Sequence, residues 1–310
     1  MTSPRPTPTR LDPLAIRRLL RDEGLRARHS LSQNFLADPD VLDAILEAAG
    51  ARAGDRILEI GPGLGILTGA LLEAGAAVTA VELDTRLAAL LRDRLGGAVV
   101  GPTADLGPGG LRLIEGDALD QDLPGLVPPP YAVVANLPYH ITSPILHRLL
   151  ERAPRPERLV LMVQWEVAER VAAPPGRMSY LSVFVQYHAD VRVAQRVPAS
   201  AFEPAPAVES AVIVAEPRRP GSVAPLDPPG SAVAEDALWA LVQAGFRERR
   251  KMIHNVLVRQ LGLPSVRVDA ALADVGIERD RRPQTLSVED WIALRVAIDA
   301  GPQLGGPVDG

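Results

Sequence analysis

Short apolar segments alternate with helical patterns along the first half of the chain, and this alternation restricts the fold more than any other feature. The apolar segments span residues 56–60, 77–81, 111–114, 131–135 and 159–163. Patterns with helical spacing lie between them, for example over residues 85–95 and 144–150. Such an order is typical of a parallel sheet with helices on both faces. Further apolar segments at 191–197 and 208–215 lack a long helix between them and predict an antiparallel hairpin at one edge. The sequence therefore predicts an α/β fold with a seven-stranded sheet.

A second, smaller domain is expected after this sheet. Residues 217–230 contain five prolines and two glycines, a composition typical of a linker. Helical patterns follow over residues 235–244, 248–261, 268–275 and 288–298. We therefore expect a sheet domain over residues 13–216 and a small all-helical domain over 231–299. Residues 1–12 and 300–310 are expected to form a disordered leader and a flexible tail.

The composition excludes several classes of protein. The chain has 310 residues, of which 47% are hydrophobic and 23% charged, so it is long enough to bury a full core and is not disordered as a whole. It contains no cysteine, which excludes disulfides and zinc-thiolate sites and fits a reducing, cytoplasmic location. The longest uncharged run contains six prolines between residues 123 and 147 and is not expected to cross a membrane.

A net charge of −5 argues against a nucleic-acid-binding protein, but the basic residues are unevenly distributed. Residues 1–30 contain seven arginines, and residues 246–260 contain five arginines or lysines against one glutamate. These two basic segments keep nucleic acid among the candidate partners.

A glycine-rich loop follows the first predicted strand, in the sequence Glu-Ile-Gly-Pro-Gly-Leu-Gly over residues 59–65. Glycine is required where a backbone turns sharply and approaches a ligand closely. A nicotinamide or flavin fingerprint has its third glycine at the sixth position. Here Gly61, Gly63 and Gly65 take the first, third and fifth positions, so a dinucleotide is disfavoured.

Carboxylates end the next two predicted strands, at Glu82 and Asp117. At the carboxyl end of a strand, Glu82 can accept hydrogen bonds from ribose hydroxyls, and Asp117 can accept one from an adenine amino group. No P-loop lysine follows the glycines, so a ligand of this site is expected to be a nucleoside that carries no phosphate. Each feature alone also fits a tight turn or an exposed strand end. Together they resemble the S-adenosylmethionine site of Rossmann-like methyltransferases.

The fourth predicted strand ends in Asn136, Leu137, Pro138 and Tyr139. The lone pair of an exocyclic adenine nitrogen is delocalised into the ring, and acceptors directed at its two N–H groups assist its attack on a methyl group. The side-chain oxygen of Asn136 and the carbonyl of Leu137 supply such acceptors, while Pro138 fixes the turn and Tyr139 stacks on the base. This chemistry needs neither a catalytic histidine nor a metal. The alternative is a turn without chemistry.

Several motifs together resemble one family. They are Gln-Asn-Phe-Leu at residues 33–36, the glycine loop at 59–65, Val-Glu-Leu-Asp at 81–84, Gly-Asp-Ala at 116–118, Asn-Leu-Pro-Tyr at 136–139, the Pro-rich segment at 202–211 and the basic segment at 246–251. The chain thereby resembles the ribosomal RNA adenine N6,N6-dimethyltransferases over residues 28 to 299.

The resemblance implies roles for individual residues. Cofactor contacts are expected at Asn34, Leu36, Glu59, Gly61, Gly63, Gly65, Glu82, Asp117, Ala118 and Asn136. Phe202 is expected to form a second wall of the target-base pocket, with core packing as the alternative. Contacts to RNA phosphates are expected at Arg247, Arg249, Arg250 and Lys251, at the start of a helix, with a solvated charged helix face as the alternative.

The resemblance also implies the substrate. The expected partner is 16S ribosomal RNA in an immature small subunit, in which two adjacent adenosines of the 3′-terminal hairpin loop are dimethylated, and the enzyme is expected to be a monomer. Three alternatives stay open: an enzyme that confers antibiotic resistance by modifying adenine in large-subunit RNA, a DNA adenine methyltransferase, and a noncatalytic RNA-binding protein, such as an assembly factor or a transcription factor of this fold.

Overall fold

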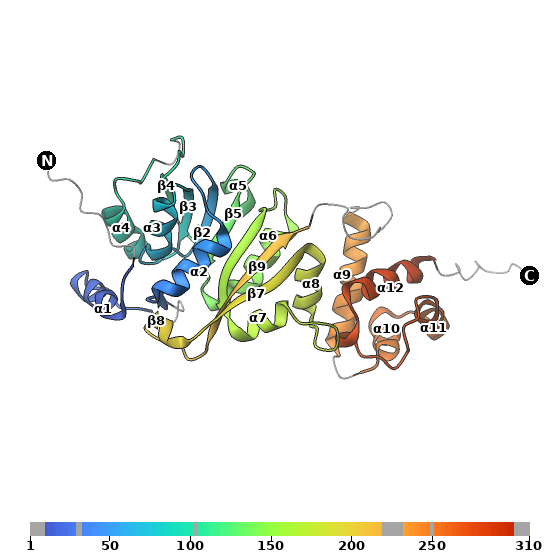
Figure 1. Ribbon diagram of the computed structural model, residues 1–310. Coiled ribbons are helices and arrows are strands. Elements are labelled where there is room, and N and C mark those ends of the chain that lie inside the picture. Colours follow the sequence, from blue (N-terminus) through green and yellow to red (C-terminus); the bar gives the residue numbers. More distant parts are fainter. Residues whose placement is uncertain (1–9, 29–32, 102–103, 219–231, 249–250, 301–310) are drawn as a thin grey trace, which may run out of the picture. The chain divides into compact units, whose positions relative to one another are not determined.

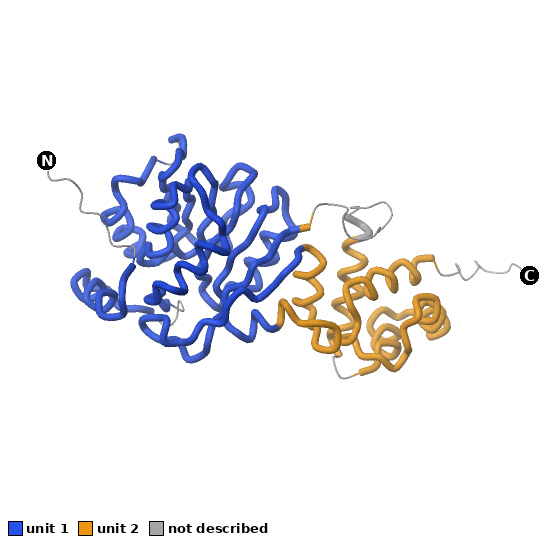
Figure 2. The backbone as a smooth tube through the Cα atoms, in the orientation of Figure 1, with its two compact units in different colours: residues 1–169, 189–217 blue, residues 170–188, 218–310 orange. Residues whose placement is uncertain are grey.

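The structure is a computed structural model that describes residues 10–28, 33–101, 104–218, 232–248 and 251–300, with the backbone alone at 232–234. The predicted leader, linker and tail lie almost entirely outside these residues. Contacts divide the chain into two compact units, the first comprising residues 1–169 and 189–217 and the second residues 170–188 and 218–310 (Figure 2).

The first unit is built on one seven-stranded sheet with the order β4-β3-β2-β5-β6-β9-β7 (Figure 1). The strands are β2 (Arg56–Ile60), β3 (Ala77–Glu82), β4 (Leu111–Glu115), β5 (Ala132–Asn136), β6 (Arg158–Gln164), β7 (Ala189–Val197) and β9 (Ser210–Pro217). Neighbouring strands from β4 to β6 are parallel, whereas β9 runs antiparallel to both β6 and β7. The predicted α/β sheet with an antiparallel pair at one edge is confirmed.

Six helices in the described part of this unit lie between strands in the chain, and only some of them begin at a side-chain cap. They are α2 (Pro39–Ala49), α3 (Ile66–Glu73), α4 (Thr85–Arg94), α5 (Leu123–Leu126), α6 (Thr142–Glu151) and α7 (Trp165–Val171), the last of which extends into the second unit. Asp38 caps α2 by accepting from the backbone N–H groups of Asp40 and Val41, and Gly50 ends it in the left-handed conformation. Buried side chains of α2, α3 and α4 join the hydrophobic core of the unit.

Two elements near the N-terminus are absent from the sequence-based prediction. Helix α1 (Pro13–Asp22) buries Ile16 and Leu20, and Asp12 caps it. Strand β1 (Phe35–Leu36) pairs antiparallel with β8 (Phe202–Glu203). A pairing of two residues with two has no periodicity to detect, and its partners are more than 160 residues apart in the sequence.

The described residues of the second unit form helices and no strand, but the unit also takes in residues 170–188, which we expected in the sheet domain. Its helices are α8 (Tyr180–His188), α9 (Ala232–Arg247), α10 (Ile253–Leu261), α11 (Ser265–Asp274) and α12 (Val288–Ala300). Val183 and Tyr187 of α8 join the same buried cluster as Leu238 of α9 and Trp291 of α12. This apolar packing explains why α8 groups with helices that follow it in the chain.

The basic segment does not lie at the start of a helix, which corrects the prediction. Phe246 and Arg247 end α9, and α10 begins only at Ile253. The backbone N–H of Ile253 donates to the carbonyl of Arg281 at 2.7 Å, so this loop contact fixes the start of α10. At the other end of the unit, Ser287 and Asp290 form the expected reciprocal capping pair of α12. None of the helices in the described ranges is long and apolar enough to span a bilayer.

Candidate functional site

A cavity of about 220 Å³ opens at the carboxyl ends of β2, β3, β4 and β5. The predicted site residues that line it are Asn34, Leu36, Glu59, Gly61, Gly63, Glu82, Asp117, Ala118, Asn136, Leu137, Pro138 and Tyr139. Four of the five segments meet there because parallel strands bring their carboxyl ends to the same edge of the sheet. The fifth segment, which carries Asn34 and Leu36, includes strand β1 (Phe35–Leu36), which belongs to a separate two-stranded sheet.

The three glycines of the glycine loop have positive φ angles, a backbone conformation that other residues rarely adopt. Gly61, Gly63 and Gly65 have φ angles of 70°, 59° and 78°. A Cβ atom on Gly63 would lie 3.2 Å from the ring of Phe35, and one on Gly65 would lie 2.5 Å from Leu91. Gly65 does not line the cavity; instead, it lets α3 begin close to Leu91 of α4.

Glu82 connects the glycine loop to the end of β3. Its carboxylate accepts hydrogen bonds from the backbone N–H of Gly63 at 3.0 Å and of Asp84 at 2.8 Å. Burial raises the pKa of Glu82, and these two N–H groups oppose that shift. Each carboxylate oxygen has a second lone pair, so the anchored side chain can still accept from a ligand.

Glu59 is the most deeply buried carboxyl group on the cavity wall, with only 1% of its surface exposed. Burial raises its pKa to about 8, and the negative charge of Glu82 adds to this shift. A hydrogen bond from the Thr68 side chain opposes part of this rise in the pKa. With a pKa of about 8, the buried carboxyl group of Glu59 is protonated at neutral pH, so it can donate a hydrogen bond as well as accept one.

Asn136 lies at the end of β5 with its amide group held in one orientation. Its Nδ2 atom donates to the backbone carbonyl of Asn34 at 3.2 Å, which leaves Oδ1 to accept a hydrogen bond. The backbone N–H of Leu137 donates to the carbonyl of Met162 at 3.1 Å. The Tyr139 hydroxyl forms a 2.8 Å hydrogen bond with Ser210 of β9. The two acceptors proposed from the sequence therefore stand beside an aromatic ring on the cavity wall.

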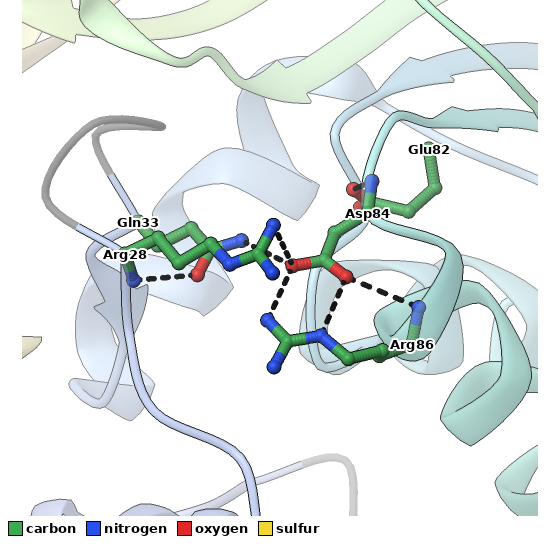
Figure 3. A network of polar contacts seen from close by, with 5 residues as sticks. All are labelled: Arg28, Gln33, Glu82, Asp84 and Arg86. Carbon is green, nitrogen blue, oxygen red and sulfur yellow. Dashed lines mark hydrogen bonds and ion pairs between the residues drawn. The ribbon is translucent and has the colours of Figure 1, made fainter.

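A polar network holds the segment that carries Asn34 (Figure 3). Asp84, whose side chain is 2% exposed, accepts from Gln33 at 3.3 Å and from the guanidinium of Arg86 at 3.0 Å, and Arg28 lies 3.7 Å away. The hydrogen bonds from Arg86 lower the pKa of Asp84 to about 2. Asp84 also accepts from the backbone N–H of Arg86, so it caps α4. Sequence analysis assigned no role to Gln33 or Asp84, although Asp84 precedes a helical pattern and could have been read as a cap.

The structure does not bring Phe202 to the cavity. Its side chain is 2% exposed and lies in the hydrophobic core, where β8 pairs it with Leu36. This placement matches the core-packing alternative rather than a wall of the base pocket.

The predicted RNA contacts belong to the second unit. Arg247 is exposed and donates to Gln260 at 3.2 Å, and Lys251 is exposed as well. Arg249 and Arg250 lie outside the described residues. No group of three or more metal-ligating side chains occurs in the part of the chain that the structure describes.

The sheet order, the glycine loop and the polar strand ends define a protein of the Rossmann-like methyltransferase class. The chain belongs to the ribosomal RNA adenine dimethylase family, whose sequence profile matches residues 24–298.

Relatives with established names cover nearly all of the chain. It is 42% identical over 292 residues to the ribosomal RNA small subunit methyltransferase A of Anaeromyxobacter sp. (strain K), a match that covers 90% of this chain and 95% of the relative. It is also 42% identical over 283 residues to the protein of that name from Geobacter sulfurreducens, a match that covers 89% of this chain and 96% of the relative.

Solved structures show the same fold. A dimethyladenosine transferase from Plasmodium falciparum superposes with a TM-score of 0.69 at 26% identity, covering 86% of this chain and 97% of that one. The 23S rRNA methyltransferase ErmE superposes with a TM-score of 0.66 at 31% identity, covering 86% and 100%.

Proposed function

We propose that this protein transfers methyl groups from S-adenosylmethionine to N6 of two adjacent adenosines in the 3′-terminal hairpin loop of 16S ribosomal RNA, giving N6,N6-dimethyladenosine. The observation that carries the proposal is the orientation of Asn136. Its amide nitrogen is hydrogen-bonded to the backbone carbonyl of Asn34, so its oxygen is available to an amino group in the same cavity that contains Glu82 and Asp117.

The cavity residues fit the cofactor. Glu59 offers a buried carboxyl group that keeps its proton to about pH 8, and Glu82 offers an anchored carboxylate for ribose hydroxyls. Asp117, whose Oδ1 accepts from the backbone N–H of Leu119 at 2.8 Å, offers an acceptor for the adenine amino group. Gly61 and Gly63 line the cavity with backbone at positive φ, which suits contact of the main chain with the methionine portion. The bound cofactor supplies an electrophilic methyl group on a sulfonium, which is already a good leaving group.

The protein's own contribution is positioning. Asn136 Oδ1 and the Leu137 carbonyl would accept hydrogen bonds from the adenine amine, which has two N–H groups in the first transfer and one in the second, and direct its lone pair toward the methyl group, while the Tyr139 ring stacks on the base. In each transfer the N–C bond forms as the C–S bond breaks, and one proton leaves N6 for solvent. An adenosine reaches such a site only when it leaves its base stack, which suits a loop of RNA.

The names of the relatives favour the small subunit as substrate. Two of them, each 42% identical, are called small subunit methyltransferases, whereas ErmE, a 23S rRNA methyltransferase, is 31% identical. The helical unit, with Arg247 and Lys251 exposed, is proposed to contact RNA phosphates. The immature state of the substrate particle, the monomeric state of the enzyme and its cytoplasmic location stay predictions.

Substrate preference tests the proposal. The protein is incubated with labelled S-adenosylmethionine and, in parallel, with immature small subunits, large subunits and naked 16S RNA, and the modified base is mapped. Labelling of two adjacent adenosines in the small subunit is expected. Preferential labelling of large subunits would reject the substrate, and binding of RNA without any transfer would favour a noncatalytic assembly factor.

A further inference from the structure

The Pro-rich segment at residues 202–211 contacts a residue of the cavity wall, although none of its own residues lines the cavity. Phe202, the residue expected there, is buried in the core. Ser210, at the other end of the segment, forms a 2.8 Å hydrogen bond with the phenol of Tyr139. The link between this segment and the proposed base pocket therefore runs through a serine hydroxyl.

Ser210 is held rigidly. It is the first residue of β9, its exposed fraction is 0%, and the sheet places it opposite Gln164 of β6 and Val197 of β7. A side chain enclosed by two neighbouring strands has little freedom to move. Its hydroxyl is therefore a fixed point for whatever group binds to it.

Tyr139 is thereby restrained at both ends. At its backbone it follows Pro138, whose φ is −57° and whose ring restricts rotation. At the far end of its ring the phenolic oxygen is bonded to Ser210. A ring with both ends fixed presents one orientation to the cavity that it lines.

We propose that Ser210 is a positioning residue for methyl transfer: its hydrogen bond to Tyr139 fixes the ring on which the target adenine stacks. This inference rests on the proposed function and deepens it, because it assigns orientation of the acceptor base to a residue outside the Asn-Leu-Pro-Tyr motif. The Tyr139 hydroxyl serves as an anchor and not as a proton donor or acceptor for the substrate.

Two isosteric variants and their combination test the pairing. Tyr139→Phe and Ser210→Ala each remove the hydrogen bond while keeping the aromatic ring and the strand. Each is expected to lower the single-turnover methyl-transfer rate on small subunits about 3- to 10-fold, the range expected for one hydrogen bond. Because both remove the same interaction, the double variant is expected to be no more than about twofold slower than the slower single variant.

Two further readouts separate positioning from loss of structure. The affinity for S-adenosylmethionine, measured by calorimetry, is expected to stay within about twofold of wild type in all three variants. Tyr131→Phe is the matched control, since its hydroxyl forms a comparable 2.9 Å hydrogen bond to the Pro154 carbonyl in the same unit but does not line the cavity. It is expected to lower the melting temperature without slowing transfer.

The opposite results would overturn the inference. Losses that multiply in the double variant, unchanged transfer in either single variant, a parallel loss of cofactor affinity, or equal slowing in Tyr131→Phe would each do so. If wild type itself binds cofactor but methylates no ribosomal substrate, the proposed function and the inference both fail. If wild type methylates the small subunit but the variants give any of these opposite results, the proposed function stands and the inference alone fails.

Discussion

At the scale of single residues, two carboxyl groups of the first unit have very different pKa values because their surroundings differ. Glu59 is buried beside another carboxylate, which raises its pKa to about 8. Asp84 accepts hydrogen bonds from Arg86 and Gln33, which lower its pKa to about 2. Strand position predicted that Glu82 and Asp117 would meet, and the family resemblance added Glu59. It did not predict Asp84 or Ser210, whose partners Gln33 and Tyr139 lie 51 and 71 residues away in sequence and meet them only in the fold.

The raised pKa of Glu59 predicts a pH-dependent stability. The unfolded group ionises near pH 4.3, whereas the folded group keeps its proton up to about pH 8. The unfolded state thus binds fewer protons between these values, and stability falls as pH rises through this window. Glu59→Gln mimics the protonated group and should remove this loss.

Denaturant unfolding of the cofactor-free protein at pH 5 and pH 9 measures the effect. The variant and wild type should be similar at pH 5, and the variant should be more stable by more than about 1 kcal/mol at pH 9, given about 1.4 kcal/mol per pKa unit. Equal stabilities at pH 9 would show that the Glu59 site does not favour the protonated form.

At the scale of elements, the sequence predicted strands and helices with a regular pattern, but it did not predict pairings of only a few residues. The strands of the sheet and helices such as α2 carry several apolar positions in a row or a capping residue, so their sequence determines them locally. Strand β1 has two residues and exists only because β8 pairs with it. Helix α9 continues through Gly245, and glycine is required at this position because a Cβ atom would lie 2.3 Å from Trp291 of α12.

The start of α3 offers a test of close packing between elements. Gly65→Ala adds a methyl group 2.5 Å from Leu91 at a φ of 78°, and a loss of about 2 to 4 kcal/mol in the free energy of unfolding is expected. The matched control is Gly24→Ala, at a φ of 62° with nothing within 4 Å of the added carbon. Backbone strain alone should limit its loss to about 1 kcal/mol. Equal losses in the two variants would mean that contact with Leu91 contributes nothing.

At the scale of the whole molecule, an acidic chain is proposed to recognise RNA. The net charge is −5, so the basic residues that contact phosphates must be grouped. The two units also show where sequence patterns fall short: α8 lies between strands β6 and β7 of the sheet in the chain, yet its buried side chains pack with α9 and α12. A linker-like composition marks where a chain leaves a domain but not which earlier segment joins the next one.

Arg247 and Lys251 carry a prediction about RNA affinity. Replacing both by alanine should weaken small-subunit binding about tenfold, reduce the salt dependence of binding by about two ion equivalents and leave cofactor affinity unchanged. Arg247→Lys with Lys251→Arg keeps both charges and serves as the control. Filter binding at several salt concentrations measures the slope, and an unchanged slope in the alanine variant would exclude these side chains from phosphate contact.

The most direct measurement of the central claim compares wild type with Asn136→Ala on small subunits and identifies the product nucleoside by mass. Wild type should form N6,N6-dimethyladenosine. The variant should still bind S-adenosylmethionine within about tenfold of wild type while its transfer rate falls by at least about 100-fold, since it loses the acceptor that directs the amine. Full transfer by the variant, or methyl groups on any atom other than adenine N6, would contradict the account.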